Sequence, residues 1–174
     1  MDHSTTALFL SHGGGPLPLL GDATHAQMVG CLQEIAAKII RPSAIIIISA
    51  HWEEETVKVT AAANPALIYD YKGFPPESYD IQYPCPGKPS LATAICQQLN
   101  SAGIDCAADQ LRGFDHGMFV PLKIMYPQAD IPCVQVSLQK GLDPLQHIKL
   151  GAALRNLADP SLLVIGSGFT FHNM

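Results

Sequence analysis

The stretch SAIIIISA, residues 43–50, contains four consecutive isoleucines and no charged residue. A continuous apolar, β-branched run of this length is typical of a strand buried on both faces of a parallel sheet. A second such run, TALFLS, occupies residues 6–11, and apolar residues recur at helical spacing between the two runs. This helix is predicted to begin near Asp22 and to end at Arg41, before Pro42. The first 50 residues therefore predict a βαβ unit.

Further strands are predicted along the rest of the chain. Apolar runs at residues 131–138 and 161–168 indicate buried strands, and an alternating run at 55–63 indicates a strand with one open face, as at the edge of a sheet. We therefore expect one domain, residues 1–174, with an α/β fold: a mainly parallel central sheet with helices on both faces, in αβα layers.

Helix boundaries can be predicted from proline, glycine and aspartate. Pro89 suits the first position of a helix that Gly103 ends, and Asp143 suits the N-cap of a later helix. Residues 69–89 are rich in Pro, Gly and Tyr and predict a long ordered loop, which in a compact domain is usually functional. The segment GFDHGMFVPL, residues 113–122, is also interpreted as a loop.

Composition restricts the function classes. The net charge of -5 and the lack of a basic run argue against nucleic acid or an anionic membrane surface as a partner, and favour a small molecule. The longest apolar run is too short to cross a bilayer. Five scattered cysteines without a CxxC pattern fit reduced thiols in the cytoplasm better than a disulfide framework or a cysteine zinc site.

Four histidines follow predicted strands or lie between glycines. His12, His51 and His172 each follow an apolar run, and His116 lies between Gly113 and Gly117. Ligands of open α/β sheets bind beyond the carboxyl ends of the strands, so these imidazoles are expected to converge there and to bind a metal or move protons. A lone histidine after a strand is, however, more often structural. The other three histidines are interpreted as surface or structural residues: His3, His25 and His147.

Two other site types find little support in the sequence. HGGGP at residues 12–16 lacks the spacing of a phosphate-binding loop, so its glycines are interpreted as a turn that brings backbone close to a ligand or metal at His12. GSGF at residues 166–169 lacks the GxSxG pattern of a serine nucleophile.

Five segments together resemble a known family. They are SHGGGP at residue 11, SAHWE at 49, YDYKGFPPESYDIQYPCPGKP at 69, FDHGMFVPL at 114 and IGSGFTFHN at 165. In this order they resemble the extradiol ring-cleaving dioxygenases of the protocatechuate type, in the 4,5-DOPA dioxygenase-like branch. The resemblance covers essentially the whole chain.

The resemblance implies a non-haem Fe(II) enzyme that uses dioxygen to open a catechol ring beside its two hydroxyl groups. His12 and His51 match the metal-binding histidines of the family. His116 and His172 match histidines proposed as acid and base, and His172 is sometimes assigned to the metal. Four aromatic residues are candidates for the wall of a pocket that holds a small aromatic diol, although they also suit a core beneath the long loop: Trp52, Tyr69, Tyr71 and Phe74.

The family pattern continues beyond HN at residues 172–173, and its later part supplies a third protein ligand. We therefore expect the 174 residues to be incomplete at the C-terminus, with an apolar face left exposed that favours self-association into a homo-oligomer. Two alternatives stay open. Zn(II) accepts the same ligands, so a zinc-dependent hydrolase is one of them. The other is a non-catalytic member of the superfamily.

Overall fold

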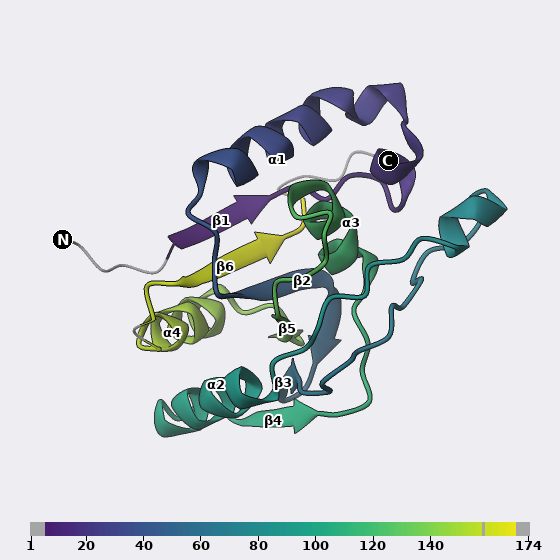
Figure 1. Cartoon of the computed structure of the whole chain (residues 1–174). Coiled ribbons are helices and arrows are strands. Elements are labelled where there is room, and N and C mark those ends of the chain that lie inside the picture. Colours follow the sequence, from purple (N-terminus) through teal and green to yellow (C-terminus); the bar gives the residue numbers. More distant parts are fainter. Residues whose placement is uncertain (1–5, 158, 170–174) are drawn as a thin grey trace.

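The structure is a computed structural model that describes residues 6–157 and 159–169. Six strands form one sheet, in the order β1-β6-β2-β5-β3-β4 (Figure 1). The strands are β1 (Thr6–Leu10), β2 (Ala44–Glu54), β3 (Val57–Thr60), β4 (Cys106–Asp109), β5 (Cys133–Gln139) and β6 (Leu162–Ser167). The first four strands of that order are mutually parallel, and β3 and β4 form a parallel pair that runs antiparallel to β5. The prediction of a mainly parallel sheet is confirmed.

Helices lie on both faces of the sheet, as predicted. In Figure 1, α1 and α3 lie on one side, and α2 and α4 lie on the other. The α-helices are α1 (Ala26–Lys38), α2 (Pro89–Ser101), α3 (His116–Met125) and α4 (Pro144–Arg155), and the short 3-10 helices are η1 (Leu17–Leu20), η2 (Ala23–His25) and η3 (Pro76–Tyr79). Within the described ranges, no helix is long and apolar enough to cross a membrane.

The predicted helix boundaries are confirmed where a capping group decides them. The Asp143 carboxylate accepts the backbone N–H of Gln146 at the start of α4. The Asp22 carboxylate accepts the backbone N–H of Thr24 at the start of η2, and η2 leads directly into α1. Each carboxylate satisfies a backbone donor that the first turn of a helix leaves without an internal partner.

Strand β2 separates two hydrophobic cores. Side chains alternate between the faces of a strand, so Ile45 and Ile47 pack with α1 and α3, whereas Ala44 and Ile46 pack with α2 and α4. All four side chains are fully buried. Burial of Ile45, Ile46 and Ile47 contributes about 1.5–3 kcal/mol each, which favours isoleucine at these three positions; Ile48 is partly buried.

Three sequence-based expectations were wrong in detail. β3 is buried and lies between β5 and β4, so the missed strand β4 forms that edge of the sheet. β1 forms the other edge, and Phe9 on it is 62% exposed, so β1 is not buried on both faces. The third error concerns residues 116–122, which belong to α3 rather than to a loop.

An apolar groove of about 610 Å³ runs between α4 and strands β1, β6 and β2.

Replacing Ile46 by Ala is expected to lower the free energy of unfolding by about 2–5 kcal/mol, because the fully buried side chain leaves a cavity between the sheet and α2. Ile40→Ala is the matched control. Ile40 is 93% exposed, so its truncation should change stability by no more than about 0.5 kcal/mol. Urea unfolding followed by circular dichroism measures both; equal losses would contradict the two-core arrangement.

Candidate metal centre

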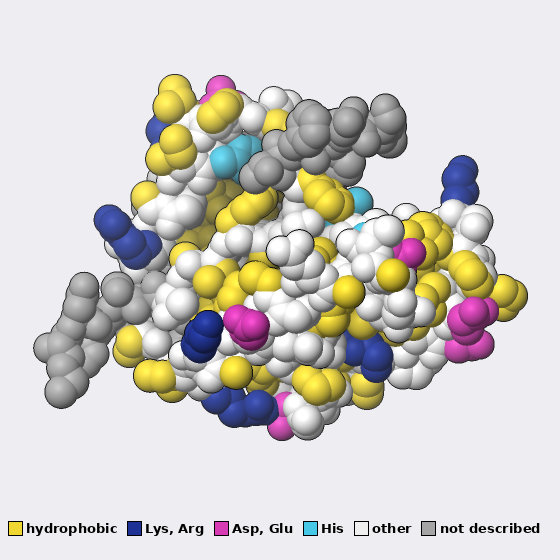
Figure 2. Space-filling view, turned by 90° about the horizontal axis from the view of Figure 1, so that it is seen from above, with side chains coloured by type: hydrophobic (Ala, Val, Ile, Leu, Met, Phe, Trp, Pro, Cys, Tyr) yellow, Lys and Arg dark blue, Asp and Glu magenta, His cyan; other side chains and the backbone are white. Residues whose placement is uncertain are grey.

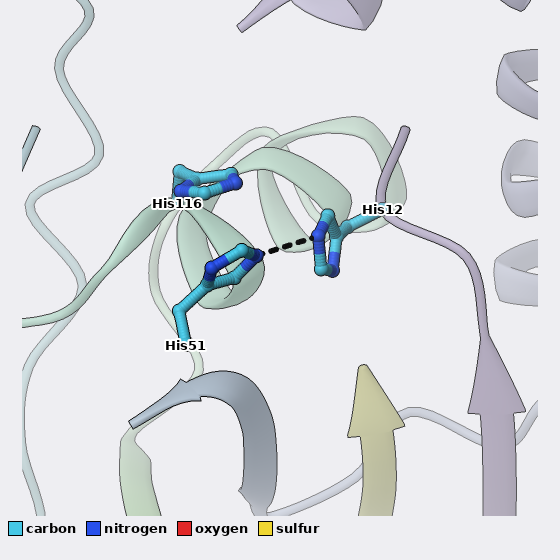
Figure 3. A group of neighbouring side chains, drawn as sticks. All are labelled: His12, His51 and His116. Atoms are coloured by element: carbon cyan, nitrogen blue, oxygen red, sulfur yellow. Dashed lines mark hydrogen bonds between the residues drawn. The ribbon is translucent and has the colours of Figure 1, made fainter. Parts of the chain in front are cut away.

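Three histidines from separate elements meet near the carboxyl ends of β1 and β2. His12 follows β1, His51 lies in β2, and His116 is the first residue of α3 (Figure 3). Their candidate ligand atoms all lie within 4.8 Å of one another. The predicted convergence of these three residues is therefore observed, whereas His172 lies outside the described residues.

His12 is buried and its tautomer follows from its hydrogen bonds. Its Nδ1 lies 3.0 Å from the Oγ of Ser167, and that hydroxyl donates its only proton to the carbonyl of Gly117. Ser167 must then accept from His12, so the ring carries its proton on Nδ1. The lone pair on Nε2 faces His51, as a metal ligand requires.

His51 lies where β2 departs from regular pairing. The register of β2 with β5 shifts between Ile48 and Glu53, which turns the His51 side chain toward His12. The two Nε2 atoms are 2.9 Å apart. Two nitrogens bound at right angles to one metal at about 2.1 Å would be about 3.0 Å apart, so the pair has the spacing of two ligands of a single ion.

A buried polar network lies next to the His51 backbone. The N–H of His51 donates to the Oγ of Ser49, and this hydroxyl donates to Asp115 at 2.7 Å. The Asp115 carboxylate is fully buried and also accepts from Gln135 and from Arg112. A buried carboxylate is costly without such partners. These bonds hold the irregular part of β2 against the start of α3.

Gly117 permits this close approach of α3 to β2. A Cβ at residue 117 would lie 2.3 Å from the Oγ of Ser49 and 3.1 Å from the His51 ring. Any side chain there would push His116 away from the other two imidazoles. The glycine after His116 is thus a packing requirement of the cluster.

Asp70 is the residue of this site that sequence reasoning missed. Its Oδ1 accepts both the backbone N–H of His116, at 3.0 Å, and the ring Nδ1, at 2.8 Å, and its Oδ2 is 4.0 Å from the Nδ1 of His51. Burial opposes ionisation of Asp70, but the hydrogen bonds from His116 outweigh it and lower the pKa of the carboxyl. The only feature of the sequence that singles out Asp70 is its position between two tyrosines, in the segment YDY.

His25, which was predicted to be a surface or structural residue, holds the glycine turn that follows His12. The N–H of Gly14 donates to the Nε2 of His25 at 3.0 Å, and the Nδ1 of His25 donates to Asp22 at 2.9 Å. His25 is therefore a structural residue that positions the turn beside His12.

Of the four candidate pocket aromatics, Tyr71 packs beside His116 of the cluster, and Phe74 packs against Tyr71. The Tyr71 ring lies 5.7 Å from that of His116, and Phe74 lies 5.5 Å from Tyr71. Tyr69 lies 6.1 Å from Tyr71, and its hydroxyl holds the loop by donating to Ile81. Burial, followed by neighbouring charges, raises the pKa of Tyr71 to about 12, so its hydroxyl stays protonated.

Trp52 lies in a different environment. Its indole N–H donates to Glu54, and Arg112 lies over its ring, 4.5 Å from the centroid. On another side of the cluster, the Phe169 ring lies 5.2 Å from that of His12, an aromatic contact that the sequence had not indicated.

The surface viewed in Figure 2 bears charged side chains singly or in small groups, without a continuous basic patch. Histidines reach this surface among hydrophobic and uncharged groups (Figure 2).

Residues 3–174 match the family model described as the catalytic LigB subunit of aromatic ring-opening dioxygenase. The chain is 46% identical to "Dioxygenase tasH" of Hapsidospora irregularis, over 95% of this chain and 54% of that protein. It is 41% identical to "4,5-DOPA dioxygenase extradiol" of Beta vulgaris, over 98% and 64%. A solved structure of an uncharacterized protein of Escherichia coli K12 superposes with a TM-score of 0.75 at 35% identity, over 96% and 61%. The chain thus spans roughly three fifths of the length of these relatives.

Asp70→Asn is expected to lower the free energy of unfolding of the metal-free protein by about 1–2 kcal/mol at pH 7, because His116 loses a charged acceptor. The Asp70 pKa is lowered on folding, so this stabilisation is present above the ordinary carboxyl pKa of about 3.9 and is lost as the pH falls through the folded value. The difference between the two proteins should therefore shrink below about pH 4.

Urea unfolding at several pH values measures this effect, with Asp80→Asn, an exposed carboxylate of the same loop, as the control. A loss that is the same at pH 7 and at pH 3.5, or an equal loss in the control, would contradict the role given to the Asp70–His116 contact.

Proposed function

Since the chain belongs to the family of catalytic LigB subunits of aromatic ring-opening dioxygenases, we propose that it takes part in non-haem Fe(II)-dependent extradiol cleavage of a catechol ring with dioxygen. The observation that carries the proposal is the pair of Nε2 atoms of His12 and His51, 2.9 Å apart, with the His116 ring beside them. The neutral tautomer of His12 fits a divalent metal.

His12 and His51 are the proposed metal-binding residues, and His172, outside the described residues, is proposed as a further ligand or a base. Fe(II) held by these residues would offer open positions for both catechol oxygens and for dioxygen, and would lower the pKa of the bound hydroxyls. Imidazole nitrogens also suit Zn(II), so the metal is identified by measurement.

His116 is the proposed proton-handling residue. Asp70 holds its Nδ1–H, which leaves Nε2 to accept a proton from a substrate hydroxyl and to return it to the leaving oxygen. The Asp70 carboxylate also stabilises the imidazolium that forms when Nε2 is protonated. Tyr71 and Phe74 are proposed to contact the flat ring of the substrate and to keep water from it.

The activity is tested with the metal supplied. The protein is loaded with Fe(II) without air, mixed with DOPA, which the name of the Beta vulgaris relative suggests, or with protocatechuate, and then exposed to air. We expect a yellow ring-opened product together with oxygen uptake. If bound iron is demonstrated and neither signal appears, the dioxygenase proposal is wrong for this chain; hydrolytic activity with zinc would favour the alternative.

Two histidine variants separate metal binding from proton transfer. His51→Ala should abolish iron retention, because it removes one of the two facing nitrogens. His116→Ala should retain iron and lower the turnover rate about 10²- to 10⁴-fold, the usual contribution of a positioned acid or base. Elemental analysis after gel filtration and the oxygen-uptake assay give the two readouts.

His147→Gln is the control, since this residue lies in α4 outside the cluster. Loss of iron from the His116 variant, with retention in the His51 variant, would reverse the assignment and make His116 a metal ligand.

A further inference from the structure

Two cysteines outside the histidine cluster face each other between α2 and β4. The Sγ atoms of Cys96, in α2, and Cys106, the first residue of β4, are 2.7 Å apart. A disulfide requires about 2.05 Å, so the two sulfurs need to approach by less than 1 Å. The two cysteines are ten residues apart and form no CxxC pattern, so the sequence did not predict that they lie together.

Asn100 holds the two cysteines in this arrangement. Its side-chain oxygen accepts the backbone N–H of Cys106 at 2.9 Å, and its amide nitrogen donates to the Cys106 carbonyl at 3.3 Å. Asn100 follows Cys96 by four residues, so both lie on the same face of α2. The backbone of Cys106 is thereby fixed opposite the Cys96 thiol.

Exposure distinguishes this pair from the other cysteines. Cys106 is half-buried and accessible to a small reagent, and Cys96 behind it is 8% exposed. Cys85 and Cys133 are almost completely buried, whereas Cys31 is exposed. Burial, followed by the Cys96 contact, raises the pKa of Cys106, so thiolate is scarce at neutral pH and reaction of this thiol with a disulfide is slow.

We propose that Cys96 and Cys106 form a reversible intramolecular disulfide by exchange with a low-molecular-weight disulfide such as oxidised glutathione. The Cys106 thiolate attacks the oxidised glutathione, which forms a mixed disulfide and releases one glutathione. The Cys96 thiolate then attacks the Cys106 sulfur and displaces the second glutathione. Two protein thiols are oxidised, and one glutathione disulfide is reduced to two thiols.

This bond ties an edge strand to the helix that covers it. β4 pairs with β3 alone within the described sheet, and the disulfide would link its first residue to α2 through a short loop. Closing such a loop restricts the unfolded chain, so the oxidised protein should unfold at a temperature about 5–10 °C higher than the reduced protein.

The test uses the full chain with Cys31→Ser, which removes the exposed thiol. The protein is incubated with excess oxidised glutathione, its remaining thiols are blocked with N-ethylmaleimide, and its intact mass and digested peptides are analysed. We expect one disulfide joining Cys96 to Cys106, two fewer blocked thiols, reversal by dithiothreitol and the rise in unfolding temperature.

Two variants in the same background check the assignment. Cys106→Ser should form no internal disulfide and gain no thermal stability, and Cys106→Ala serves if the serine variant misfolds by circular dichroism. Asn100→Ala should slow disulfide formation several-fold, because it releases the backbone of Cys106. Full blocking of all four thiols after the incubation, a bond that maps to Cys85 and Cys133, or a disulfide-linked dimer would each overturn the proposal.

Discussion

The double-sided burial of β2 is the constraint on which the rest of this structure depends. Ile45, Ile46 and Ile47 are fully buried and point to alternate faces, so the strand lies inside the sheet with helices above and below it. β1, β6 and β2 are parallel, so their carboxyl ends meet at one edge. The common direction of these strands therefore places His12 and His51 at the same edge of the sheet.

Orientation of the imidazoles depends on partners from distant parts of the chain. Ser167, at the end of β6, fixes the tautomer of His12, and Asp70, from the long loop, fixes that of His116. Each partner makes a second hydrogen bond that fixes its own position. The Ser167 hydroxyl donates to the Gly117 carbonyl in α3, and the Asp70 carboxylate also accepts the backbone N–H of His116. Substitution of Ser167 or Asp70 would therefore change the orientation of the His12 or His116 ring, although neither residue contacts the ring nitrogens that point into the cluster.

The strands other than β4, the capped helices and the meeting of three histidines could be predicted, because period, caps and strand ends are local signals. Helix α3 could not, because His116–Met125 is buried on nearly every side and so lacks an apolar stripe, and it contains Gly117 and Pro121. β4 is a four-residue strand, CAAD, with little β preference. Asp70 has a role only through tertiary contacts, which no local pattern reveals.

Different parts of the chain border the histidine cluster on its two sides. The loop that carries Tyr71 and Phe74 reaches the glycine turn, where a Cβ on Gly15 would lie 3.0 Å from the Phe74 ring. On the other side, Phe169 contacts His12 and also lines the apolar groove beside α4. Ser167, which is hydrogen-bonded to His12, lines the same groove. The histidine cluster is therefore in direct contact both with the aromatic loop, through Tyr71, and with the end of β6 and the residues that follow it, through Ser167 and Phe169.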